Sequence, residues 1–192
     1  MKKLLVGLIV MGLLFTTACG KKVEHYGVEA KTPGFESLQE MEDSCSVIVK
    51  VIREEQEEPI ITSSDGRIVS GYTFSQVNIE QIYKDDTDTL EVGDTIRILE
   101  NEVFSEQEQI IYHIAGYNMM EEGKEYLLFL NKSLYFDKEP YYVASGVNYG
   151  TVSLEEDDRT TVYLSRNGQQ VVEFSAMQPI WDAAIEKYIR NE

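Results

Sequence analysis

The stretch YTFSQVNIEQIY, residues 72–83, decides the fold of this chain. Apolar and polar side chains alternate along most of it, which is the period of a β-strand with one face against a core. The alternation predicts that Val77, Ile79 and Tyr83 face a core, whereas Ile82 lies on the opposite face.

Strand-like segments continue on both sides of this stretch. Residues 46–53 are so rich in Val and Ile that they predict a strand buried on both faces, and residues 125–130 repeat that pattern. Asp65-Gly66 and Asn167-Gly168 are the dipeptides typical of tight hairpins. Many short strands between regular turns favour a barrel or a sandwich. The fold class predicted is therefore mainly β, as a curled antiparallel barrel.

Two short helices are expected at the ends of this sheet. Phe35, Leu38 and Met41 recur every three residues, which indicates a short N-terminal helix. Residues 175–190 predict an amphipathic C-terminal helix, with capping-box spacing from Ser175 to Gln178. Its apolar stripe consists of Trp181, Ala184, Ile185, Tyr188 and Ile189.

The N-terminus has the anatomy of an export signal. Two lysines precede twelve apolar or glycine residues, and small residues lead to Cys19. A transmembrane anchor is the alternative, but a spanning helix needs roughly 20 apolar residues. The arrangement resembles the lipobox of bacterial lipoproteins, although Thr16 stands where leucine is usual. That resemblance implies cleavage before Cys19 and a diacylglycerol on its thiol. The expected organisation is a signal peptide at 1–18, a tether at 19–34 and one β-rich domain at 35–192.

Four segments together resemble a group of bacterial lipoproteins and the netrin-like module, which is the barrel of tissue metalloprotease inhibitors. They are residues 37–51, residues 72–84, Val92-Gly93-Asp94-Thr95-Ile96, and GKEYLLFL at 123–130. The resemblance implies an OB-like five-stranded barrel. Here Lys84 is followed by Asp85, where the pattern has glycine. The inhibitory mechanism needs a free N-terminal cysteine held by disulfides, so it is not expected of a chain whose Cys19 carries lipid.

Charge excludes one class of partner. The chain has 17 Lys and Arg against 34 Asp and Glu, a net charge of −17. Such a surface repels phosphate backbones, so no nucleic acid partner is expected. If Cys19 is lipidated, Cys45 has no partner for an internal disulfide. Beside the apolar run that follows it, Cys45 is expected to be a small buried side chain rather than a reactive thiol.

Motifs for catalysis are missing from the sequence. It contains no His-Glu-x-x-His, P-loop or Gly-x-Ser-x-Gly motif, and its two histidines, His25 and His113, lie far apart along the chain. No catalytic residue, resident metal or cofactor is therefore predicted. The acidic loop with Asp86, Asp88 and Asp94 is a weak calcium candidate, because its match to an EF-hand loop fails at the glycine position.

Aromatic residues gather in the last third of the chain. Next to polar side chains, such residues are typical of platforms for sugars or peptides, although tyrosine is also common in strands. The candidate partner surface consists of Tyr135, Tyr141, Tyr142 and Tyr149.

These observations predict a lipid-anchored, extracytoplasmic binding module without catalytic activity. Its partners are expected to be the membrane, through the lipid on Cys19, and an envelope protein or a small ligand at residues 84–94 and 135–149. Two alternatives stay open: an envelope enzyme that uses paired carboxylates, and a purely structural envelope lipoprotein.

Overall fold

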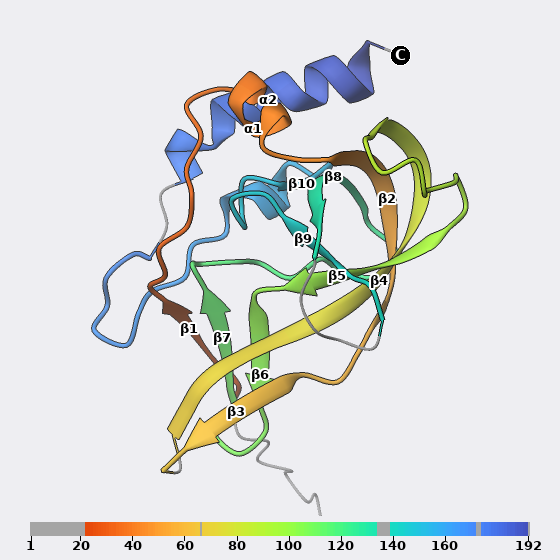
Figure 1. Ribbon diagram of the computed structural model, residues 1–192. Coiled ribbons are helices and arrows are strands. Elements are labelled where there is room, and N and C mark those ends of the chain that lie inside the picture. The colour runs from red at the N-terminus through yellow and green to blue at the C-terminus, as the bar shows by residue number, and fades with distance from the viewer. Residues whose placement is uncertain (1–21, 66, 134–138, 172–173, 192) are drawn as a thin grey trace, which may run out of the picture.

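The computed structural model describes residues 22–65, 67–133, 139–171 and 174–191, and these fold mainly into strands (Figure 1). The strands are β1 (Glu24–Val28), β2 (Val47–Gln56), β3 (Ile60–Ser64), β4 (Arg67–Asp85), β5 (Thr95–Glu100), β6 (Glu102–Ser105), β7 (Ile110–Ile114), β8 (Glu125–Lys132), β9 (Tyr142–Ala144) and β10 (Thr151–Ser153). The helices are α1 (Leu38–Asp43), α2 (Gln178–Ile185) and three short turns, η1 (Asp157–Thr160), η2 (Phe174–Ala176) and η3 (Glu186–Arg190). The prediction of a mainly β chain is confirmed.

Five of the strands close into a barrel. β2 pairs with β4, β4 with β5, β5 with β9, β9 with β8, and β8 again with β2. This closed five-stranded ring is compatible with the OB-like barrel expected from the sequence. The prediction that it is antiparallel is wrong at one pair, since β5 and β9 are parallel. The reason is parity: strands that alternate in direction around a ring of five must include one parallel pair.

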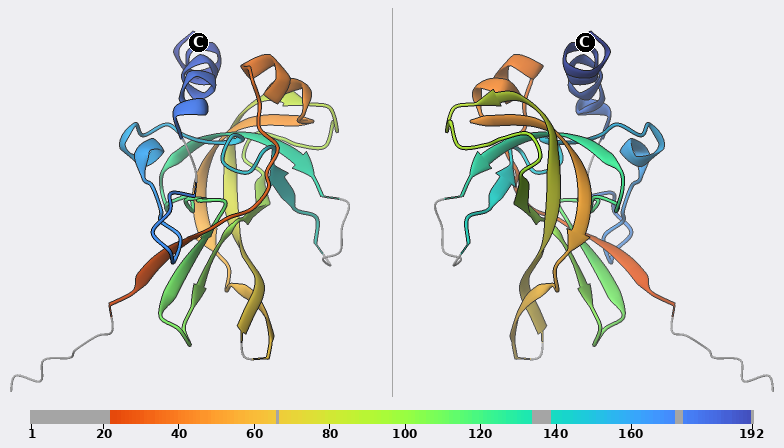
Figure 2. Two further views of the ribbon diagram at one scale, coloured as in Figure 1. Left: turned by 90° about the vertical axis from the view of Figure 1, so that its left-hand side faces the viewer. Right: turned by 90° about the vertical axis from the view of Figure 1, so that its right-hand side faces the viewer.

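A second, smaller sheet lies beside the barrel. β1 pairs with β7 in parallel, and β6 pairs with β7 in antiparallel fashion. The hairpin of β6 and β7 and the hairpin of β3 and β4 both project away from the helices (Figure 2). Gly71 allows β4 to approach this sheet, because a Cβ atom there would lie 2.9 Å from Cγ1 of Val103. β1 occupies five residues of the segment that the sequence analysis assigned to a tether.

The barrel wall separates two hydrophobic cores. In β8, Leu128 and Leu130 face the barrel interior, whereas Leu127 and Phe129 face the helices, and all four are fully buried. β2 divides in the same way, with Val49 inside and Ile48 outside. The continuous apolar runs in these two strands therefore serve both cores, as the sequence predicted.

Register shifts between β2 and β4 change which core the side chains of β4 face. Val77 and Ile79 point into the barrel as the alternation predicts. After them the register with β2 shifts twice, and it passes from Ile82, opposite Val49, directly to Lys84, opposite Ile48. Ile82 consequently packs on the barrel core and Tyr83 on the helix-side core, which is the reverse of the prediction.

The helices cover one side of the barrel (Figure 1). The predicted N-terminal helix is confirmed as α1, whose first turn is capped by Ser37 Oγ accepting from the Glu40 amide at 3.2 Å. The apolar stripe of the C-terminal helix is also confirmed, with Trp181, Ala184 and Ile185 buried. Its predicted capping box is wrong, since α2 begins after Met177, which makes no side-chain cap.

Candidate functional site

Among the described residues, two openings combine a largely buried arginine with space for a ligand. The first, which we call the barrel groove, has a volume of about 470 Å³ and lies where β4 and β5 meet the residues around the β8–β9 connection. Its lining includes Gln76, Leu90, Thr95, Arg97, Lys132 and Tyr142. The two strands that close the barrel here, β5 and β9, pair at only two residue positions, so their shared edge is short. Such openings in the walls and mouths of barrels are common ligand sites.

Arg97 dominates the side of the barrel groove formed by β5. Its guanidinium stacks on the Phe74 ring, with Cζ 3.5 Å from the ring centroid. Glu57 holds it in place through two bonds of 2.6 and 2.5 Å. Tyr141 packs against the same Phe74 ring, at 5.1 Å between centroids. The groove thus has a rigid cation–aromatic edge beside the apolar side chain of Leu90.

The second opening, which we call the histidine cleft, has a volume of about 510 Å³. It lies between the barrel and the smaller sheet, and its lining includes His25, Arg53, Glu102, His113, Glu122 and Tyr163. The His113 and Tyr163 rings stack with their centroids 3.3 Å apart. His113 is only 1% exposed, whereas His25 on β1 is exposed.

Hydrogen bonds set the proton positions on the two histidines. His113 Nδ1 lies 2.9 Å from the Tyr117 carbonyl and 2.9 Å from Glu102 Oε2, and since both accept, Nδ1 donates. In neutral His113, Nε2 then accepts from His25 Nδ1, 3.0 Å away. This leaves Nε2 of His25 as an acceptor. Burial and, secondarily, the neighbouring His113 lower the pKa of His25, so it is neutral at pH 7.

Arg53 is the buried cation of the histidine cleft. It extends from β2, is 6% exposed, and donates from Nη2 to Gln56 Oε1 at 3.2 Å. Its nearest carboxylate, that of the exposed Glu122, is 4.0 Å from Nη1. Among the described residues, Nε of Arg53 has no hydrogen-bond partner. A buried donor without a partner is unusual in folded proteins, which makes this guanidinium a candidate ligand-binding group.

Glu100 lies behind the cleft and is fully buried. It accepts from the Ser75 hydroxyl, from the Tyr117 hydroxyl at 2.9 Å and from the Met120 amide at 3.0 Å. Burial raises the pKa of this carboxyl to about 7, although all three hydrogen bonds act in the opposite direction. Its acceptor capacity is used within the protein, so Glu100 is a structural group at this end of the barrel.

The predicted tyrosine surface is not brought together as one face. Tyr142 is buried in the barrel core, where it also lines the barrel groove, and Tyr149 is buried in the helix-side core. Only Tyr141 is partly exposed beside Phe74. Tyr135 lies outside the described residues. The sequence could not separate these roles, because tyrosine occurs both in cores and on binding surfaces.

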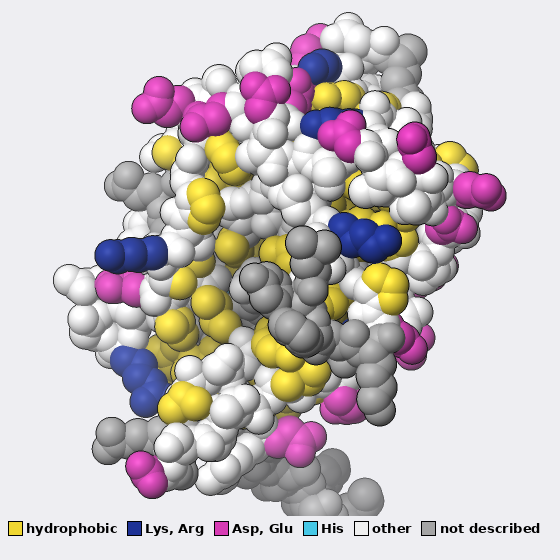
Figure 3. All heavy atoms as spheres, in the orientation of Figure 1, with side chains coloured by type: hydrophobic (Ala, Val, Ile, Leu, Met, Phe, Trp, Pro, Cys, Tyr) yellow, Lys and Arg dark blue, Asp and Glu magenta, His cyan; other side chains and the backbone are white. Residues whose placement is uncertain are grey.

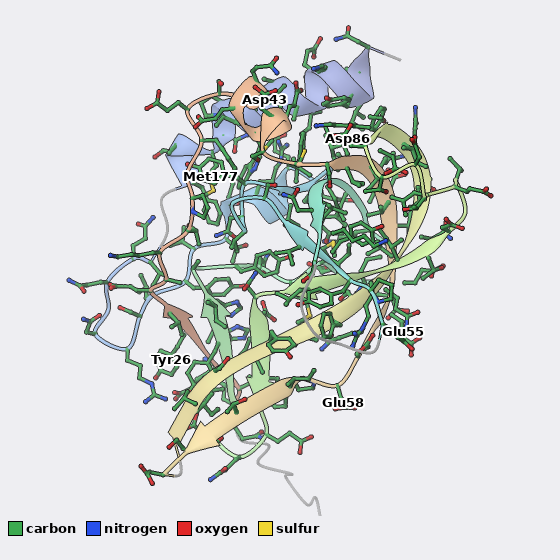
Figure 4. All side chains as sticks on the ribbon, in the orientation of Figure 1. Tyr26, Asp43, Glu55, Glu58, Asp86 and Met177 are labelled. Atoms are coloured by element: carbon green, nitrogen blue, oxygen red, sulfur yellow. The ribbon has the colours of Figure 1, made fainter. Side chains whose placement is uncertain are left out.

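The acidic loop is built by carboxylates that cap its own backbone. Although burial opposes it, hydrogen bonds from the Thr87 hydroxyl and from the backbone amides of Leu90, Thr87 and Thr89 lower the pKa of Asp85. Asp94 accepts from the Glu91 amide at 2.8 Å. Asp86 lies at the end of β4 near α1 (Figure 4), where it pairs with Lys84 at 3.3 Å.

The calcium candidate formed by Asp86, Asp88 and Asp94 finds no support in this geometry. Within the described parts of the chain, no three His, Cys, Asp or Glu side chains converge in a way that would hold a metal ion. Calcium prefers at least six oxygen ligands, and this loop directs its carboxylates to amides and a lysine instead.

The cysteines also lie apart from both openings. Cys45 is buried in the helix-side core, as predicted, and burial raises the pKa of its thiol to about 11. Cys19 lies outside the described residues. Among the described helices, none is long and apolar enough to cross a membrane.

Acidic side chains dominate the charged surface. They are scattered around the face shown in Figure 3, with exposed hydrophobic side chains between them. Both openings contain basic as well as acidic side chains: Arg97, Lys132 and Glu139 line the barrel groove, and Arg53, Glu102, Glu121 and Glu122 line the histidine cleft. In sequence, the chain matches no known protein family and no curated protein.

The sequence analysis missed the histidine cleft. His25 and His113 are separated by 88 residues, and only the parallel pairing of β1 with β7 places them side by side. The sequence placed Arg53 at the end of a predicted strand and gave no indication of a function for it. The one available signal was an arginine at the end of an otherwise apolar run, at residues 46–53, where burial of a charge would need explanation.

Proposed function

We propose that this protein is a lipid-anchored, extracytoplasmic binding module, and that the barrel groove receives an extended segment of another envelope protein. The observation that carries the proposal is the groove itself, which is lined by Arg97, held between Phe74 and Glu57, and by the exposed Lys132. Positive charge from Lys132 beside fixed apolar side chains suits a peptide with both acidic and apolar residues, because contacts with fixed side chains form with little loss of side-chain entropy.

The position of the groove supports this proposal. OB-fold barrels bind oligonucleotides and oligosaccharides on the face of their second and third strands and on adjoining loops. In chain order, β4 and β5 are the second and third strands of the ring, and the groove lies along them and beside Glu139 and Pro140. The net charge of −17 disfavours nucleic acid as the ligand, which leaves peptides and sugars.

Kinship with netrin-like modules is part of the proposal. The closed five-stranded ring and the C-terminal helix packed against it support it. The protease-inhibiting mechanism does not come with that kinship, because Cys19 would carry the lipid anchor.

The anchor is tested by metabolic labelling. Cells that express the full chain are fed an alkyne analogue of palmitate, and the protein is expected to acquire the label and to remain in the membrane fraction. The Cys19→Ala chain is expected to lose both properties, while Cys45→Ala keeps them. If Cys19→Ala stays labelled and membrane-bound, the anchor is elsewhere and the proposed attachment is wrong.

The groove is tested by photo-crosslinking in intact cells. A photoreactive phenylalanine analogue replaces Thr95, whose exposed side chain lines the groove. The control position is Ala183, which is exposed on α2. We expect a discrete protein adduct from position 95 that weakens with Arg97→Gln, and none from position 183. If no adduct forms at position 95, a protein partner at this groove is refuted. A sugar ligand is then the hypothesis to test for the groove.

The alternative of an enzyme with paired carboxylates receives less support. Glu102, Glu121 and Glu122 line the histidine cleft, but Glu100, the carboxyl whose pKa is raised, does not. An acid–base pair must reach the substrate with both groups. A purely structural role would require deletion of the protein to weaken the envelope, whereas a binding module predicts normal envelope integrity.

A further inference from the structure

The histidine cleft carries an inference that is independent of the barrel groove. Its basic pole is Arg53, which is more than nine-tenths buried and lines the cleft. Within the described residues its Nε–H has no acceptor, and the carboxylate of Glu122 stays 4.0 Å from Nη1. A guanidinium in this state is prepared for a planar acceptor from outside the protein, and a carboxylate matches its geometry.

The opposite pole of the cleft accepts protons. When His113 is neutral with its proton on Nδ1, His25 Nδ1 donates to His113 Nε2, which leaves Nε2 of His25 as an acceptor. Glu102 uses Oε2 for its contacts with the Met119 amide, at 3.1 Å, and with His113, which leaves Oε1 to accept from a ligand. Glu122, 4.0 Å from Nη1 of Arg53, lies at the rim beside the basic pole and does not belong to this group. His25 and Glu102 suit a positively charged donor, whereas an anion alone would meet the carboxylate of Glu102.

The other acidic side chain of the rim, Glu121, is already paired with Lys124 at 3.0 Å. The residues that line the cleft therefore include a cationic pole, Arg53, and an anionic pole, Glu102, and the volume of the cleft is about 510 Å³. That volume is within the range of small-molecule sites, which extends over roughly 300–1,000 Å³.

We propose that the histidine cleft binds a small zwitterion, namely a free amino acid or a short peptide. Its carboxylate bonds to the guanidinium of Arg53, and its ammonium group donates to Nε2 of His25 and to Glu102. No bond is made or broken. Each pole alone is disfavoured in this site, since a simple anion is repelled by Glu102 and a simple cation by Arg53.

The test is calorimetric titration of the full-length protein in detergent. The probe is alanylalanine, and acetate and ethylamine serve as single-pole controls at the same ionic strength. We expect alanylalanine to bind with a dissociation constant of about 1 mM or below, and each single-pole probe to bind at least about tenfold more weakly. Equal binding of acetate would overturn the zwitterion in favour of a simple anion, and no binding of any probe would overturn the site.

Three variants locate the binding. Arg53→Gln and His25→Gln are each expected to weaken alanylalanine binding by about tenfold or more. Arg159→Gln is the matched control: Nε of Arg159 is the other buried side-chain atom without a partner in the described parts of the chain, but the cavity it lines has a volume of only about 40 Å³. Unfolding curves without ligand show which variants fold, and the exposed His25 keeps the test valid if Arg53→Gln does not fold. Full binding by folded Arg53→Gln or His25→Gln would overturn the proposed site.

Discussion

Glu100 and Arg53 are both buried ionisable side chains, yet their surroundings differ. Glu100 is surrounded by donors from Ser75, Tyr117 and Met120. Arg53 has Gln56 as its near partner and keeps one donor unused among the described residues. A buried group whose hydrogen bonds are satisfied internally supports the fold, whereas the unused donor of Arg53 fits the ligand role that we propose for it.

The largest loss of stability is expected when the carboxyl group of Glu100, which accepts three hydrogen bonds within the protein, is removed. Glu100→Ala leaves the Ser75 and Tyr117 hydroxyls and the Met120 amide without their acceptor and opens a cavity. We expect the free energy of unfolding to fall by about 3–5 kcal/mol at pH 5, as measured by urea denaturation. A loss below about 1 kcal/mol would show that water replaces the carboxyl and that Glu100 is not structural.

The pH dependence of stability follows from the same carboxyl. Its ordinary pKa of 4.5 rises to about 7 in the folded protein, so between these values the folded state holds a proton that the unfolded chain has released. The free energy of unfolding should therefore fall as the pH rises from about 4.5 to 7, by up to about 3 kcal/mol.

Glu100→Gln is the matched variant for this prediction, because it keeps the shape of the side chain and does not titrate. Denaturant titrations at a series of pH values are expected to give a flatter profile for Glu100→Gln than for the wild type. Parallel profiles would assign the pH dependence to another group.

Replacing Arg53, whose hydrogen bonds are incomplete, should instead increase the stability of the ligand-free protein. Arg53→Met replaces a buried guanidinium with an apolar side chain of similar length, and we expect the ligand-free protein to gain about 1 kcal/mol. Thermal unfolding with and without alanylalanine checks this, since the variant should also lose any stabilisation by the probe. A loss of more than about 1 kcal/mol would mean that Arg53 supports the fold, as Glu100 does.

Glu42 supplies an intermediate case with a smaller effect. This buried carboxylate of α1 accepts from Tyr188 at 2.9 Å and from Lys187 at 2.7 Å, both on the C-terminal helical turn. Tyr188→Phe removes one of these donors and should cost about 0.5–1.5 kcal/mol. Tyr26→Phe, which loses an exposed bond to Glu24, is the control and should cost less. Equal losses would show that burial of Glu42 adds nothing to its bond with Tyr188.

The comparison also shows how far sequence patterns reach. Burial on both faces of residues 46–53 was predictable, because strands that serve two cores lack polar positions. The faces of Ile82 and Tyr83 were not, because two register shifts between β2 and β4 interrupt the alternation. The capping box at Ser175 failed for a similar local reason, since the chain forms η2 before α2 begins at Gln178.

For the candidate sites, the sequence named residue types but not their neighbours. Aromatic residues near Tyr141 indicated a binding surface, and the structure places Tyr141 on Phe74 beside Arg97. The pairing of His25 with His113 had no sequence signal, because β1 joins β7 across more than 80 residues. Calcium binding at Asp86 and Asp88 was a pattern match that the loop geometry does not support.

By itself the sequence determined the β-rich class, the two helices, the acidic surface and the case for an anchor at Cys19. These properties depend on composition and on short-range periodicity, which each segment carries alone. The tertiary structure decided the closure of the barrel through a parallel pair, the exchange of faces after Ile79 and the meeting of His25, His113 and Arg53 in one cleft. Those outcomes depend on register and strand order, which are set by contacts between segments distant in sequence.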